Sequence, residues 1–184
     1  MEPAIGLIEL KSVARGIVVT DVIAKKAPVT VLRTHPVCPG KYIVLFSGDV
    51  APVDESLRAG IEAAGDLLVN DLFLPHVHES IIPAISGAVV VEKFASLGVI
   101  ETFSVASCIV AADIAAKKAD VTLTEIRLAM GLGGKAYFVM TGEQHSVEAS
   151  LEAATEYVRG EGLLAGSEII RSPHEDVIEK GVYW

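Results

Sequence analysis

The chain has 184 residues, which is enough for one ordinary domain or two small ones. Hydrophobic residues make up 51% of it and charged residues 21%, so there is ample material for a buried core. A formal net charge of −9 argues against general affinity for nucleic acid or anionic membranes. No apolar run could span a bilayer, and we expect no signal segment. Two cysteines cannot form a disulfide framework, so we expect a reduced, cytoplasmic protein.

The chain contains two copies of one sequence pattern. Gly6 returns as Gly98, 92 residues later, and after a two-residue insertion the same order of residues continues. This register predicts a duplicated domain, with copies over residues 1–87 and 96–184 and a linker over 88–95. The matched segments are residues 4–9 and 97–101, 24–27 and 116–119, 29–30 and 121–122, and 40–41 and 134–135.

The predicted elements follow the same order in both copies. A largely apolar strand with one Glu opens each copy, and an Ala-rich helix that is apolar on nearly every side follows it. Two β-branched strands joined by a glycine-containing loop come next, then an amphipathic helix and a fourth strand. In chain order the elements are strand 5–10, helix 13–27, strands 29–34 and 42–47, a helix around 53–64, strand 67–74, strand 98–103, helix 105–119, strands 121–127 and 136–141, a helix around 147–158 and strand 163–170.

The order β-α-β-β-α-β is that of the ferredoxin-like fold, so the predicted class is α/β (α+β), with that unit in tandem. The fold hosts many functions and does not choose among them. Ala129 and Ala136 stand where a Walker loop needs Gly and Ser or Thr, and no nucleophile elbow is visible. His76 and His78 match no zinc spacing. We therefore expect no catalytic residues and no enzyme.

Several segments resemble bacterial microcompartment shell proteins, and the resemblance covers nearly the whole chain twice. It is strongest with the tandem-domain type, including members from propanediol-utilisation compartments, to which Cys38-Pro39-Gly40 and the Gly-rich loop at 131–135 are similar. The other segments that carry the resemblance are the opening residues 4–9, the Ala-Lys-Lys-Ala at 24–27, and the pairs Pro75-His76 and Pro173-His174.

The resemblance implies a structural protein of the microcompartment shell in the cytoplasm. Such proteins form homotrimers that mimic a six-domain disc and tile with other shell proteins into a facet, around a central pore. The resemblance assigns the pore to the loops between the second and third strands, and the subunit edge to Lys25, Lys117, His76 and His174. The implied pore residues are His35, Pro36, Val37, Cys38, Pro39 and Gly40 in the first copy, and Met130, Gly131, Leu132, Gly133 and Gly134 in the second.

Cys38 lies between two prolines, which stiffen its segment. From the residues alone, it could merely line or narrow a pore, since free cysteine usually acts as a small hydrophobe. In a trimer one cysteine per chain supplies three thiolates, whereas iron–sulfur clusters ordinarily take four. The resemblance implies a [4Fe-4S] cluster bound by Cys38 of each subunit, which would pass electrons to enclosed redox enzymes or be delivered across the shell. Cys108 lies in a helical stretch and is expected in the core.

Two alternatives remain open at the level of the sequence. One is a shell protein whose pore passes a metabolite and holds no cluster. The other is a soluble regulatory protein with the same ferredoxin-like fold, which would bind a small molecule in a cleft between the repeats.

Overall fold

The computed structural model describes residues 4–91 and 94–182. Residues 1–3, 92–93 and 183–184 lie outside the described residues; they include the start of the first expected domain, part of the expected linker and the end of the second expected domain. The chain divides into two compact units, one ending at Val77 and the other beginning at His78.

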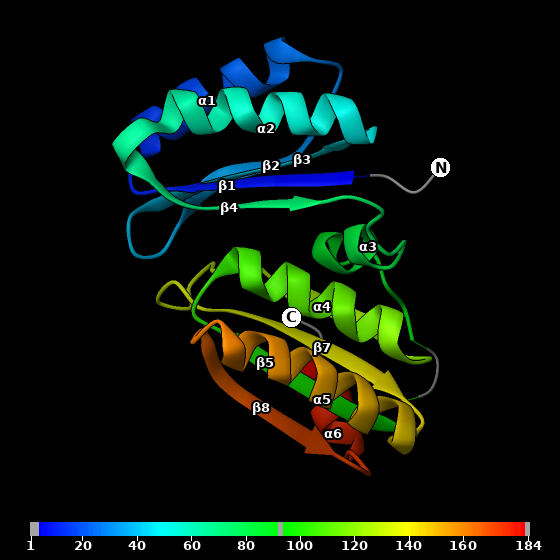
Figure 1. Cartoon of the computed structure of the whole chain (residues 1–184). Helices are drawn as coiled ribbons and strands as arrows, with labels where there is room; N and C mark the ends of the chain where they lie inside the picture. The colour runs from blue at the N-terminus through cyan, green and yellow to red at the C-terminus, as the bar shows by residue number, and fades with distance from the viewer. Residues whose placement is uncertain (1–3, 92–93, 183–184) are drawn as a thin grey trace. The chain divides into compact units, whose positions relative to one another are not determined.

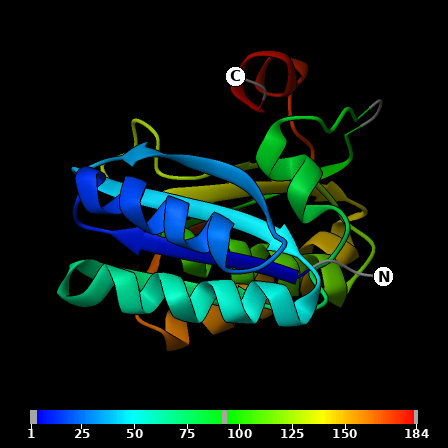
Figure 2. The ribbon, with the colours of Figure 1, turned by 90° about the horizontal axis from the view of Figure 1, so that it is seen from above.

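The first unit is a four-stranded antiparallel sheet with two helices on one face (Figure 1). Its strands lie in the order β2-β3-β1-β4, and α1 and α2 pack against each other along the strands (Figure 2). Its elements are β1 (Ala4–Leu10), α1 (Val13–Lys26), β2 (Thr30–Val37), β3 (Lys41–Gly48), α2 (Val50–Ala64), a short 3₁₀ turn (Gly65–Leu67) and β4 (Leu68–Leu74).

The second unit repeats this arrangement, with strands in the order β6-β7-β5-β8, and adds a short helix before it and another after it. Helices α4 and α5 pack against each other as α1 and α2 do. Its elements are α3 (Ile81–Ser86), β5 (Ser96–Thr102), α4 (Val105–Lys118), β6 (Thr122–Arg127), β7 (Ala136–Gly142), α5 (Gln144–Gly160), β8 (Leu164–Ile170), α6 (Glu175–Val177) and a π-helical turn (Ile178–Val182).

The first helix of each unit begins at a serine cap. The Ser12 hydroxyl accepts a hydrogen bond from the Arg15 backbone N–H at 3.2 Å, and Ser104 accepts from Ser107 at 3.4 Å. Such caps satisfy backbone N–H groups that have no partner inside the helix. None of the helices within residues 4–91 and 94–182 combines the length and the apolar character needed to cross a bilayer.

The predicted β-α-β-β-α-β order and its duplication are confirmed, and one loop differs from expectation. Strand β2 continues to Val37, so His35, Pro36 and Val37 belong to the strand, and the loop shrinks to residues 38–40. Pro36 is tolerated because β2 is an edge strand of its sheet, where a missing N–H can face solvent.

The helix α3 was not expected from the sequence, and it lies in the second unit. It packs on β6 and α4, with Ile81, Ala84 and Ile85 buried. The boundary between the two compact units therefore follows Val77, whereas the sequence suggests a first domain that runs to Gly87.

Candidate functional site

Cys38 lies at the tip of the hairpin that joins β2 to β3. Its side chain is partly exposed, and the Cys38–Pro39 peptide bond is cis. Gly40 has a φ of +74°, in the left-handed region that favours glycine. The two strands stay paired up to Val37 and Lys41, so the thiol is carried at the end of an ordered ladder.

Each chain can supply one thiol, that of Cys38, to a metal centre at this turn. Among residues 4–91 and 94–182, no group of three or more His, Cys, Asp or Glu side chains could hold a metal ion. A partly exposed thiol on this turn fits a cluster only if other copies of the chain bring their own Cys38 to the same place.

The other residues assigned to the first pore loop differ in exposure. Pro36, Pro39 and Gly40 are exposed, whereas Val37 is buried. His35 is partly buried, and this burial, with a smaller contribution from the Arg33 guanidinium, lowers its pKa below 6.5. The imidazole is therefore held in its neutral form at neutral pH.

The second expected pore loop lies between β6 and β7 and is longer than the first. Met130, Gly131 and Gly133 are exposed, while Leu132 is partly buried and Gly134 is buried. The three glycines and the preceding Ala129 all have positive φ. At the end of the loop, Lys135 forms an ion pair with Glu101 of β5 at 2.6 Å.

Cys108 is fully buried in α4, as expected for a core residue. Burial raises the pKa of its thiol to about 12, and a hydrogen bond with Thr102 offsets only part of that rise. A thiol in this state is a poor metal ligand, because the thiolate is the form that binds.

The expected edge lysines occupy equivalent places near the ends of α1 and α4. Lys25 pairs with Asp21 at 2.7 Å, and Lys117 pairs with Asp113 at 2.6 Å. The side chain of Asp21 is 60% exposed, but that of Asp113 is only 5% exposed. The two lysines are thus exposed in both domains, whereas the aspartate is exposed in the first domain and buried in the second.

The expected edge histidines are not structural counterparts. His76 follows β4 with a φ of +55°, whereas His174 caps α6 by accepting the Asp176 backbone N–H on Nδ1 at 3.2 Å. The counterpart of His174 is His78, whose Nδ1 accepts the Ser80 backbone N–H at 3.3 Å. The same spacing relates β4 to β8 and His78 to His174.

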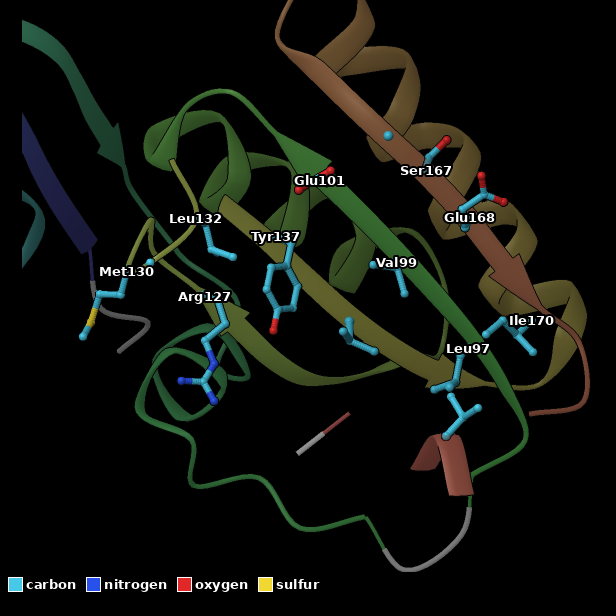
Figure 3. A pocket seen from close by; sticks show the side chains of 14 residues that line it. Leu97, Val99, Glu101, Arg127, Met130, Leu132, Tyr137, Ser167, Glu168 and Ile170 are labelled. Carbon is cyan, nitrogen blue, oxygen red and sulfur yellow. The ribbon is translucent and has the colours of Figure 1, made fainter. Parts of the chain in front are cut away.

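A pocket of about 680 Å³ lies on the face of the second sheet opposite its helices (Figure 3). Gly98 of β5 faces Val147 of α5, so the alternate residues of β5 point away from the helices. The pocket is lined by Leu97, Val99, Glu101, Arg127, Met130, Gly131, Leu132, Tyr137, Val139, Gly166, Ser167, Glu168, Ile170 and Val177.

The polar groups at one side of this pocket form a small network. Glu125 binds the Arg127 guanidinium and also accepts a hydrogen bond from the Tyr137 hydroxyl at 3.2 Å. Burial and the nearby Glu125 carboxylate raise the pKa of Tyr137. Our sequence reasoning missed this network, although the two-residue alternation along strand 121–127 places Glu125 and Arg127 on one face.

The chain matches the BMC domain family twice, over residues 4–77 and 96–173. It is 42% identical to the bacterial microcompartment shell protein PduT of Citrobacter freundii over 96% of both chains. It is also 31% identical to the carboxysome shell protein CcmK2 of Synechocystis, over 42% of this chain and 75% of that one.

Solved structures agree with these relationships. A microcompartment protein from Desulfitobacterium hafniense DCB superposes with a TM-score of 0.93 and 46% identity, covering 97% of this chain and 99% of that chain. A fused permuted hexameric shell protein from the RMM microcompartment has a TM-score of 0.61 at 24% identity over 85% of both chains, which supports the fold alone. The chain therefore belongs to the BMC-domain family of bacterial microcompartment shell proteins and carries the family's domain twice.

Proposed function

We propose that this chain is a structural tile of a bacterial microcompartment shell in the cytoplasm, built as a ring of three identical subunits. The observation that carries the proposal is that the two domains have apolar side chains at equivalent surface positions but bury them unequally. Where a surface is buried in one domain and its counterpart is exposed in the other, we expect the exposed surface to bind another copy of the chain.

The outer face of α1 illustrates this imbalance. Ile17 is 59% exposed, and Val13 and Val18 are exposed beside it. Ile109, at the equivalent place in α4, is completely buried, as is Val105. Full burial of a Val or Ile side chain contributes about 1.5–3 kcal/mol, so covering this face of α1 would favour association by several kcal/mol.

The sheet faces opposite the helices show the reverse imbalance. In the first domain, Leu7 and Glu9 of β1 are buried, whereas their counterparts Val99 and Glu101 of β5 are only partly buried and line the pocket. The first domain therefore exposes a helix face, and the second exposes a sheet face. A contact between unlike surfaces is heterologous. Such contacts form a closed ring when the rotation from one subunit to the next is a whole fraction of a full turn.

The proposed ring brings the three Cys38 turns to a common axis. Three thiolates would hold a [4Fe-4S] cluster, leaving one iron for a ligand other than cysteine. A bound cluster would exchange single electrons, and the site would serve electron transfer across the shell or delivery of the cluster through it. What supports this assignment is the contrast between the partly exposed Cys38 and the buried Cys108, whose raised pKa keeps it protonated.

Iron content tests the cluster directly. Protein purified without oxygen should contain about four irons per three chains and absorb in the visible range. The Cys38→Ser variant should lose the iron and the colour and keep the oligomeric mass. The Cys108→Ala variant is the matched control and should keep all three properties.

Two results would count against the cluster. Iron retained by Cys38→Ser would place it elsewhere, and a wild-type trimer without iron would favour a pore that passes a metabolite.

Electron microscopy tests the tile itself, because flat sheets of discs support a shell protein. Separate particles that bind a small molecule in the pocket of the second domain would support the regulatory alternative.

A further inference from the structure

The short segment that begins at His78 is held on the second domain by a hydrogen bond and by helix packing. The Asp113 carboxylate of α4 accepts the His78 backbone N–H on Oδ1 at 2.8 Å and binds Lys117 through Oδ2 at 2.6 Å. Helix α3 then lies across α4 and the edge strand β6. Ile81 of α3 is completely buried by this packing.

The docked segment has a duplicate at the end of the second domain. His174-Glu175-Asp176 repeats His78-Glu79-Ser80, and each histidine caps the following turn through Nδ1. The helical turn α6 follows His174 as α3 follows His78. Val177 holds the place of Ile81, yet it is 38% exposed.

The surface that receives the segment also has a duplicate, on the first domain. Asp21 and Lys25 of α1 repeat Asp113 and Lys117, and Asp21 pairs with Lys25 through Oδ2, as Asp113 does with Lys117. Within residues 4–91 and 94–182, no backbone N–H donates to Asp21. A carboxylate oxygen at the position of Asp113 Oδ1 is thus available to a donor from outside.

The neighbouring edge strands differ in the same way. Leu123 and Thr124 of β6, beside α3, are buried, whereas Val31 and Leu32 at the same places in β2 are only partly buried. Both the docking segment and its receiving surface therefore occur twice in the chain. Within the residues that the structure describes, only the first segment, which begins at His78, packs on such a surface, that of the second domain.

We infer that the segment 174–182 of one subunit docks on α1 and β2 of the neighbouring subunit, with the His174 backbone N–H donating to Asp21. The partner is a second copy of this chain, because α4 and β6 bind the segment that begins at His78. The equivalent surface of α1 and β2 should therefore bind the equivalent segment, which begins at His174. This inference rests on the proposed ring and specifies one of its contacts. The contact joins the end of one chain to the first domain of the next, so it fixes the direction of the ring.

Disulfide trapping tests the contact in the intact protein. In a Cys38→Ser background, Asp21→Cys combined with His174→Cys should give covalent two- and three-chain species on mild oxidation, which disappear on reduction. His78→Cys with Asp113→Cys copies the occupied contact and should close within one chain. Asp54→Cys with His174→Cys is the negative control, because Asp54 lies in an ordinary surface ion pair with Arg58 of α2.

Native mass spectrometry of the same variants separates the possible failures. A trimer that gives no covalent ladder, or a bond that closes within one chain, would overturn this contact and leave the ring standing. A monomer at all concentrations would overturn both. The Asp21→Ala variant should weaken trimer formation at least tenfold, since it removes the acceptor of a buried hydrogen bond, while Asp54→Ala should leave it unchanged.

Discussion

At the scale of single residues, the two cysteines have opposite environments, and their positions explain why. Cys38 interrupts a strand pair at a turn, where a side chain points out of the packed layers, whereas Cys108 faces inward from a helix covered on nearly every side. The sequence predicts both placements, since Pro39 and Gly40 mark the turn and small or apolar residues flank Cys108. The proposed cluster could not be predicted from these residues alone, because its ligands would come from separate chains.

Glu9 is a buried carboxylate of the first sheet, with only 1% of its side chain exposed. It pairs with Lys41 at 2.9 Å. Lys41→Met should therefore lower the free energy of unfolding by about 3–5 kcal/mol, because it leaves a charge buried without a partner. Chemical denaturation at fixed protein concentration measures the change.

The control for this substitution is Arg58→Met, which breaks the surface pair with Asp54. Such exposed pairs contribute about 0–1 kcal/mol. Equal effects of the two substitutions would show that Glu9 is solvated in the folded protein.

His35 should make stability depend on pH. Its pKa in the folded chain lies below the ordinary value of 6.5, and its Nε2 is among the buried atoms without a hydrogen-bond partner in the described part of the chain. As the pH falls below 6.5, the unfolded chain binds the proton more readily than the folded chain, so stability is lost. Above that pH both states are neutral and the effect disappears.

Thermal unfolding of the wild type and of His35→Gln at pH 8 and pH 5.5 measures this dependence. The wild type should lose more stability between the two pH values than the variant does. The same pH response in both proteins would assign the loss to other groups.

At the scale of elements, the two domains fill the contact between the first helix and the third strand of the unit in different ways. A Cβ on Gly16 of α1 would lie 2.5 Å from Cγ of Tyr42 on β3. The second domain places Cys108 and Ala136 at these two positions. The larger residue of each pair thus faces a smaller one, which keeps the packing dense.

This exchange predicts that Gly16→Ala destabilises the protein by about 1–3 kcal/mol through overpacking. Gly160→Ala is the matched control, since nothing lies within 4 Å of its Cβ position at the end of α5. It should be neutral or stabilising by up to about 1 kcal/mol. Denaturant midpoints of both variants provide the comparison.

A double variant checks the proposed cause. Gly16→Cys with Tyr42→Ala copies the pair of the second domain and should be less destabilised than Gly16→Cys alone. Additive losses would mean that the two residues do not share one packing site.

The sequence predicts the repeated elements well because hydrophobic periodicity and the duplication agree with each other. It does not predict α3, because Ile81–Ser86 follows a stretch of turn residues and contains Pro83. The helix gains its stability from packing on β6 and α4, which is a tertiary effect. The extension of β2 through Pro36 escapes prediction for a similar reason, since the pairing with β3 overrides the local preference.

At the scale of the whole molecule, the duplication produces surfaces that are alike in sequence and unlike in burial. Ile17, Asp21 and Val177 are exposed, whereas Ile109, Asp113 and Ile81 at the equivalent positions are buried. Within one chain, the terminal segment of the second domain has no following domain to pack on. The matching surface of the first domain has no preceding domain to cover it. A closed ring supplies a neighbouring domain to both.

The mass of the assembly in solution decides whether such a ring forms. Sedimentation velocity over a wide range of protein concentrations should give a single species with three times the chain mass of 19.4 kDa. A species that stays at 19.4 kDa throughout would leave the exposed faces of α1 and of the second sheet unpaired, and it would remove the shared axis on which three Cys38 thiols could meet.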